Sequence, residues 1–91
     1  MRLEIVSPEA TLFSGDVTSV TLPGIMGEFE LLNNHAPVIS LLKEGNVKIN
    51  GNITLEEDVE QLFKKSDQGF WLAITSGTLE VKDNKVIVLA D

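Results

Sequence analysis

The chain has 91 residues, of which 43% are hydrophobic and 23% are charged, and its formal net charge is −7. A chain of this length folds around one core and leaves little room for a deep catalytic pocket. It contains no cysteine, which excludes disulfides, thiolate metal sites and cysteine nucleophiles, and its fourteen acidic against seven basic residues disfavour nucleic acid as a partner.

Short apolar segments separated by turn-forming residues run along the whole chain. Glycine, proline, asparagine and aspartate recur about every 8 to 12 residues, a spacing typical of a sandwich or barrel of short strands. We predict strands over residues 3–6, 17–22, 28–32, 37–42, 47–49, 70–75, 78–81 and 85–89. The predicted fold class is therefore all-β, and no apolar stretch approaches the roughly 20 residues that a membrane helix needs.

The last predicted strands form a hairpin. Leu79 and Val81 alternate with charged residues, and the polar pair Asp83 and Asn84 tolerates the positive φ that a two-residue turn requires. The runs over residues 70–74 and 86–89 are apolar at successive positions, so both of their faces are apolar. This indicates that their outer faces are covered by something other than solvent, such as another subunit.

One segment, residues 55–65, interrupts the strand pattern. Its apolar residues follow the i, i+4, i+7, i+8 spacing of one helix face, and they are Leu55, Val59, Leu62 and Phe63. Thr54 and Glu57 have the spacing of a capping box. The pattern favours a short amphipathic helix, and a solvated hairpin excursion is the alternative.

Catalytic and metal-binding patterns are scarce. The single histidine, His35, has no serine-containing elbow beside it, and its alternative role is that of a turn residue bonded to backbone. The acidic run over residues 56–60 lacks the glycine and the alternating ligand spacing of a calcium loop, so a solvated helix face is the favoured interpretation. We predict no catalytic residue, no metal site and no cofactor.

Several short motifs occur in an order that resembles one family. They are Phe13-Ser14-Gly15-Asp16-Val17, Thr21-Leu22-Pro23-Gly24, Gly27-Glu28-Phe29-Glu30, Asn34-His35-Ala36-Pro37, Lys43-Glu44-Gly45, Ser76 to Val81 and Val86 to Asp91. Each motif is weak alone, but the ordered set covers most of the chain. The sequence is similar to the N-terminal domain of the epsilon subunit of F-type ATP synthases, called delta in mitochondria.

This resemblance implies a ten-stranded antiparallel β-sandwich, jelly-roll-like, formed by residues 1–91, with a long connection over residues 50–69 that holds the expected helix. It implies a non-catalytic subunit of the rotating central stalk of a proton-translocating ATP synthase, which couples rotation to ATP synthesis. The implied partners are the gamma subunit and the c-ring, with the alpha/beta hexamer reached through the complex. The subunit would lie peripherally at the cytoplasmic face of the bacterial membrane, associated with it only through the complex.

The family commonly continues after Leu-Ala-Asp into a C-terminal helical hairpin that can inhibit ATP hydrolysis. This sequence ends at Asp91. If it is a whole gene product, the inhibitory hairpin is absent.

The resemblance also places candidate contact residues. In the family an acidic loop touches the c-ring, and the matching residues here are Glu28, Phe29 and Glu30; a solvated carboxylate is the alternative for Glu28. His35 lies near the same end in the family and would contact gamma or the ring, or would have a structural role only. The candidates for the gamma-facing surface are Phe70, Trp71 and Val88, chosen because their strands are apolar on both faces.

Two other function classes make different predictions. A free-standing β-sandwich that binds a ligand such as a sugar would need exposed aromatic platforms, and the chain has one tryptophan and no tyrosine. An enzyme would need a pocket of perturbed acids around His35.

Overall fold

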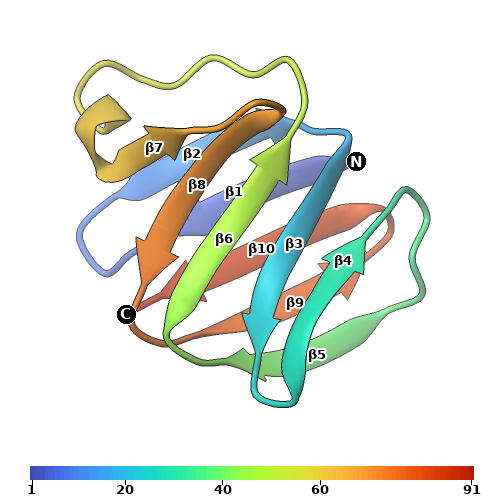
Figure 1. Cartoon of the computed structure of the whole chain (residues 1–91). Coiled ribbons are helices and arrows are strands. Elements are labelled where there is room, and N and C mark those ends of the chain that lie inside the picture. The colour runs from blue at the N-terminus through green and yellow to red at the C-terminus, as the bar shows by residue number, and fades with distance from the viewer.

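The computed structural model describes all 91 residues, which form ten strands and one turn of 3-10 helix in two facing layers (Figure 1). The elements are β1 (Arg2–Val6), β2 (Thr11–Asp16), β3 (Ser19–Gly24), β4 (Gly27–Leu31), β5 (Val38–Leu42), β6 (Gly45–Asn50), η1 (Glu60–Leu62), β7 (Phe63–Lys65), β8 (Gly69–Ile74), β9 (Gly77–Lys82) and β10 (Lys85–Ala90). The predicted all-β sandwich is confirmed.

Each layer is named here by its central strand. The β10 sheet has the order β2-β1-β10-β9-β5, and the β6 sheet has the order β4-β3-β6-β8-β7. The two sheets join where Gly24 of β3 pairs with Leu42 of β5. Every pairing is antiparallel except that of β1 with β10, which is parallel and brings the two ends of the chain into neighbouring strands.

The core lies between the two sheets and follows from strand alternation. In β10, Val86, Val88 and Ala90 are buried, whereas the intervening Ile87 and Leu89 face outward. Both sheets contribute such inward rows to one cluster of 17 buried hydrophobic residues. Because side chains point to alternate faces of a strand, burial of one row determines which residues form the outer faces.

The β9–β10 hairpin is confirmed in its register and its turn. Lys82 pairs with Lys85, and Asp83 and Asn84 have φ values of 53° and 59°. Both central residues of a type I′ turn need positive φ, and short polar side chains tolerate it. The turn therefore forms where the Asp-Asn pair predicts it.

The amphipathic helix expected over residues 55–65 is wrong. Only Glu60–Leu62 form a single 3-10 turn, with no side-chain cap, and Phe63–Lys65 continue as strand β7. Val59 is buried, but Leu62 is 49% exposed, so the four apolar residues do not form one packed face. Pairing of β7 with the free edge of β8 satisfies backbone groups that a short, marginally stable helix would leave exposed. No helix here is long or apolar enough to span a membrane.

Two strands, β2 and β7, were not predicted from the sequence. Residues 14–16 have turn-forming composition, yet they pair with β1, where Gly15 lies opposite Leu3. Added side-chain atoms at Gly15 would meet the ring of Phe13, 3.1 Å away, so the glycine makes room for that ring. Composition indicates a turn here because it does not show that Gly15 makes room for the Phe13 ring within a paired strand.

The two ends of the sandwich differ in construction. The tight β3–β4 connection projects at the lower end in Figure 1, and the long segment from β6 to β7 crosses the upper end. Ile53 and Leu55 of that segment pack against the core, and Val59 is buried. The upper segment thus covers the end of the core, whereas the lower connection stands clear of it.

Candidate functional site

The two acidic candidates of β4 lie on the outer face of the β6 sheet. Oε2 of Glu28 is 3.0 Å from Nζ of Lys48, and the Lys48 ammonium lies 4.5 Å from the centroid of the Trp71 ring. Glu30 is exposed and opposes Thr21 in the strand register, and it has no ion pair. The structure therefore separates two carboxylates that the sequence treats alike: Glu28 is partly neutralised, and Glu30 is free.

Phe29 points the other way, toward the interior. It is half-buried and packs against the core. A Cβ at Gly24 would lie 2.7 Å from the Phe29 ring and 2.9 Å from the carbonyl oxygen of Gly27, so only glycine fits there. Phe29 consequently supports the β3–β4 connection from beneath, and Glu28 and Glu30 are the residues of this trio that face solvent.

The connection itself carries two exposed apolar residues that the sequence analysis did not single out, Ile25 and Met26. We call them the hairpin tip. Ile25 is 57% exposed and Met26 is 98% exposed. Gly24 pairs with Gly27, which has φ +125°, so two residues close the turn. The sequence does contain a sign of this tip: two large apolar residues stand between glycines, at positions where a solvated turn normally has polar residues.

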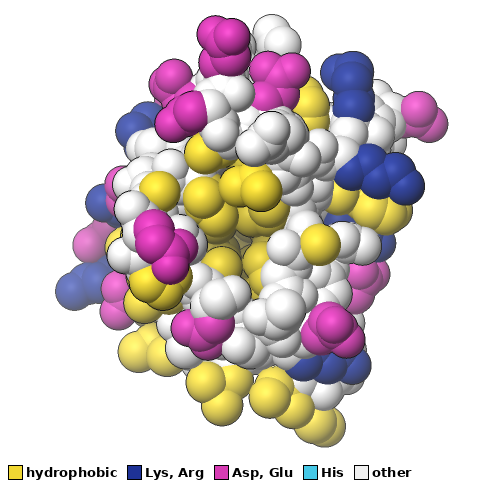
Figure 2. Space-filling model, turned by 90° about the vertical axis from the view of Figure 1, so that its left-hand side faces the viewer, with side chains coloured by type: hydrophobic (Ala, Val, Ile, Leu, Met, Phe, Trp, Pro, Cys, Tyr) yellow, Lys and Arg dark blue, Asp and Glu magenta, His cyan; other side chains and the backbone are white.

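A shallow groove of about 410 Å³ separates the hairpin tip from β5. Its apolar lining is contributed mainly by the tip, by Phe29 and by Ile39 and Leu41 of β5. Figure 2 shows hydrophobic side chains projecting from the lower end of the molecule, where the β3–β4 connection lies in Figure 1, and acidic ones gathered at the upper end. Hydrophobic side chains therefore project from the lower end of the sandwich, in addition to those at the centre of the face seen in Figure 2.

That His35 contacts the same partner as the acidic residues of β4 stays a prediction; His35 itself makes no hydrogen bond or ion pair with Glu28 or Glu30. It follows β4, whereas the hairpin tip precedes it, so a five-residue extended strand separates them. The His35 loop is held by the amide of Asn34, which donates to Oδ1 of Asn84, and by Asn33, which accepts from the Met1 amino group. Nδ1 of His35 lies 2.7 Å from the Ala36 oxygen, and the ring is exposed.

The three gamma-facing candidates do not form one surface. Val88 is 0% exposed within the core, which removes it as a surface contact. Phe70 is half-buried and meets Phe63 edge-on, with ring centroids 6.5 Å apart. Trp71 lies on the outer face of the β6 sheet beneath Lys48, whereas Val88 belongs to the other sheet. A strand with apolar residues at successive positions is apolar on both faces, but the sequence does not say which of those faces lies against the core.

The exposed apolar surface instead lies on the outer face of the β10 sheet. Ile39 and Leu41 are 78% and 61% exposed, and Leu89 is 51% exposed. In the strand register Leu41, Thr78 and Leu89 form one row across β5, β9 and β10, and Ile39, Glu80 and Ile87 form the next. We call Ile39, Leu41, Ile87 and Leu89 the apolar face. It adjoins the groove at the hairpin tip through Ile39 and Leu41.

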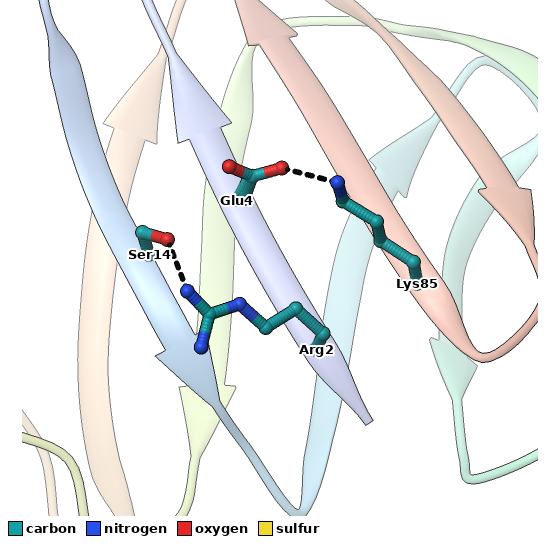
Figure 3. Close-up of polar contacts among 4 residues, drawn as sticks. All are labelled: Arg2, Glu4, Ser14 and Lys85. Atoms are coloured by element: carbon teal, nitrogen blue, oxygen red, sulfur yellow. Dashed lines mark hydrogen bonds and ion pairs between the residues drawn. The ribbon is translucent and has the colours of Figure 1, made fainter.

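The same sheet becomes polar beyond β10 (Figure 3). Nζ of Lys85 is 2.9 Å from Oε1 of Glu4, and Nη2 of Arg2 donates to Oγ of Ser14 over 2.8 Å. Lys85 and Glu4 thus form an ion pair across β10 and β1, and Arg2 hydrogen-bonds across β1 and β2 to a neutral hydroxyl. Polar residues therefore lie both within and beside the apolar face: Thr78 and Glu80 of β9 separate its β5 pair from its β10 pair, and the charged side chains of β10 and β1 lie beyond it.

The surfaces can bind, but they carry no catalytic constellation. No three His, Cys, Asp or Glu side chains come together as metal ligands would. A polar groove beside Trp71 includes Thr21, Asn50 and Asp67, yet Lys48 already covers the indole ring on which a sugar would stack. The geometry therefore gives little support to a ligand-binding module built on Trp71.

Comparison with known protein families gives one match over residues 1–59, described as ATP synthase, Delta/Epsilon chain, beta-sandwich domain. A curated ATP synthase epsilon chain from Campylobacter concisus is 43% identical over all 91 residues. Another from Chlorobium limicola is 38% identical over 90 residues, and the match covers 99% of this chain and 88% of that protein. The chain spans 60% of the length of the Campylobacter concisus relative.

A solved structure has the same fold. A chain in the cryo-EM structure of the central stalk and c-ring of the Tetrahymena thermophila mitochondrial ATP synthase superposes with a TM-score of 0.73. The superposition covers 98% of this chain and 61% of that one, at 16% sequence identity. At that identity the likeness supports the fold, and the sequence relatives carry the assignment to a family.

Proposed function

The chain belongs to the family of ATP synthase delta and epsilon chains, through their β-sandwich domain, and from that membership we propose that it is a non-catalytic subunit of the central stalk of a proton-translocating F-type ATP synthase. In this role it binds the gamma subunit and the c-ring and couples their rotation to ATP synthesis. The observation that carries the proposal, beside family membership, is the set of exposed apolar residues on the outer face of the β10 sheet, Ile39, Leu41 and Leu89.

The apolar face is the proposed contact with gamma. Three of its residues are more than half exposed, and such a patch on a small domain marks a surface that a partner covers. One partner can contact the whole face, because its rows of side chains run across three neighbouring strands. The proposed gamma contact therefore does not include the buried Val88, and it lies on the β10 sheet, opposite the layer that carries Trp71.

The end with the hairpin tip is the proposed contact with the c-ring. The tip projects beyond the sandwich, and the free carboxylate of Glu30 and the paired carboxylate of Glu28 lie on the strand that follows it. The apolar tip and the carboxylates together can bind the loops of the c-ring through both packing and charge. His35, at the far end of β4, is proposed to orient its loop or to touch gamma, but not to touch the ring.

The subunit thus reaches the alpha/beta hexamer and the cytoplasmic face of the membrane only through the assembled complex. The side chains needed for ATP hydrolysis are supplied by other subunits in this proposal. The role of this chain is mechanical. The sandwich is rigid enough to transmit torque because each of its ten strands is hydrogen-bonded to a neighbour in one continuous sheet.

The test is assembly on membranes. The tagged chain is added at low salt to bacterial membranes that carry the rest of the ATP synthase, and gamma and c subunits recovered with it are quantified. Recovery of both supports the proposal, and recovery should fall with the variant Leu41→Glu but not with Ala73→Glu, which lies on the opposite outer face. Absence of both subunits with the unmodified chain would reject the central-stalk role.

A further inference from the structure

The chain has two methionines, and the fold treats their sulfur atoms very differently. Met1 is half-buried and packs against the core, and its amino group donates to the Val17 oxygen over 3.2 Å and to Oδ1 of Asn33 over 2.8 Å. Met26 is 98% exposed at the hairpin tip. Because there is no cysteine, Met26 presents the single freely accessible sulfur of the chain.

The position of Met26 is built into the backbone. Gly24 admits no side chain because the Phe29 ring lies against it, and Gly27 adopts a left-handed φ of +125°. Both constraints determine a two-residue turn, whose residues stand outward from the paired strands. Met26 consequently cannot withdraw into the core without unpairing the end of β3 and β4.

The surroundings of Met26 are apolar. It lines the groove of about 410 Å³ together with Ile25, Phe29, Ile39 and Leu41. Oxidation of a methionine turns a flexible apolar side chain into a polar one and disrupts contacts that depend on it. An oxygen atom on Met26 would therefore change the chemistry of the whole lower end of the sandwich.

We propose that Met26 is an oxidation site for peroxides and that its sulfoxide weakens docking of the hairpin tip. The thioether sulfur attacks one oxygen of hydrogen peroxide, the O–O bond breaks and a sulfur–oxygen bond forms. The proton on the transferred oxygen passes to the departing hydroxide, which leaves as water. Sulfur loses two electrons, which the peroxide gains. The docking half of this inference rests on the proposed c-ring contact, and the oxidation half rests only on the exposure of Met26.

Docking of the tip and oxidation of Met26 oppose one another. A tip buried against a partner is closed to peroxide, so oxidation reaches Met26 only in subunits that have come free. By thermodynamic linkage, the factor by which oxidation lowers affinity for the partner equals the factor by which docking disfavours the sulfoxide relative to the thioether. The sulfoxide of Met26 thus forms in released subunits and lowers their affinity for the partner when they dock again.

The first experiment tests the site alone. The purified chain is treated with hydrogen peroxide, and the sulfoxide at each methionine is followed by peptide mass spectrometry. Met26 is expected to oxidise at least about tenfold faster than Met1 in the folded chain, and the two rates should converge in urea. Equal rates in the folded chain, or faster oxidation of Met1, would overturn the assignment of Met26.

The second experiment tests docking, with purified c-ring in nanodiscs as the partner. Peroxide treatment and Met26→Gln should each lower affinity by about tenfold, and methionine sulfoxide reductase should restore the oxidised chain. Met26→Leu should have the same affinity after peroxide as before it, because leucine has no sulfur to oxidise. Ring added before peroxide should protect Met26. If the untreated chain binds neither ring nor gamma, the proposed function fails; if it binds and oxidation changes nothing, the switch alone fails.

Discussion

The two outer faces of the sandwich are made of the same kind of strand but offer different chemistry. On the β6 sheet Glu28, Lys48 and Trp71 satisfy one another through an ion pair and a cation–π contact. On the β10 sheet Ile39, Leu41 and Leu89 stand exposed without such partners. Surface polar groups that already pair with one another have little to gain from a partner. Covering exposed apolar side chains, in contrast, lowers the free energy. The difference identifies which side of the subunit needs a neighbour.

The largest expected effect separates the inner from the outer row of β10. Val88→Ala should lower the free energy of unfolding by about 2 kcal/mol, because it removes two methyl groups from a filled core. Leu89→Ser, one residue further, should change stability by less than about 0.5 kcal/mol. Urea unfolding followed by circular dichroism measures both. Equal losses from the two variants would mean that Leu89 is part of the core and that the apolar face is smaller than described.

The next effect concerns binding. Ile39→Glu and Leu41→Glu should each lower affinity for gamma by at least about tenfold, because each places a charge inside a covered apolar surface. Ala73→Glu on the β6 sheet is the matched control and should bind as the unmodified chain does. Isothermal calorimetry with purified gamma gives the affinities. A loss for Ala73→Glu and none for the other two would move the gamma contact to the β6 sheet.

A smaller effect distinguishes the two carboxylates of β4. Glu30→Gln should weaken c-ring docking about threefold more than Glu28→Gln, because Lys48 already offsets part of the charge of Glu28. The difference should shrink as the salt concentration rises, since exposed charges are screened. Affinities measured in low and high salt provide the test. The reverse order would mean that docking pulls Glu28 away from Lys48.

The smallest expected effect lies within the β6 sheet itself. Lys48→Met should change unfolding free energy by no more than about 1 kcal/mol, since surface ion pairs and exposed cation–π contacts contribute little. It should nevertheless alter the fluorescence of Trp71, the single tryptophan, because the ammonium leaves its ring. An unchanged emission spectrum would indicate that Lys48 does not rest on the indole in solution.

Local patterns predicted most strands but failed where neighbours decided the outcome. The Asp83-Asn84 hairpin followed from two polar residues, because a tight turn is a local event. The helix expected around Val59 failed because its spacing also suits an irregular segment that packs Leu55 and Val59 inward and then supplies strand β7 to an open edge. Strand β2 was missed because Gly15 serves a ring packed against it, not a turn.

The candidate site followed the same division. Motif order pointed to Glu28 and Glu30, which do lie on an exposed face, but it could not say that Lys48 pairs with one of them. Val88 was selected from an apolar run and proved to be core, while its neighbour Leu89 is exposed. A run of four apolar residues does not reveal which row faces inward, because that depends on which layer lies beneath.

The family, the all-β class, the absence of thiol chemistry and the acidic surface were determined by the sequence alone, because composition, turn residues and motif order are properties of the chain itself. The parallel pairing of β1 with β10, the joining of Ile39 and Leu41 to β10 in one apolar face, and the placing of Met26 at a free tip were decided only by the tertiary structure. These features depend on which strands become neighbours, and strands far apart in sequence meet only because burying both inner rows in one core lowers the free energy.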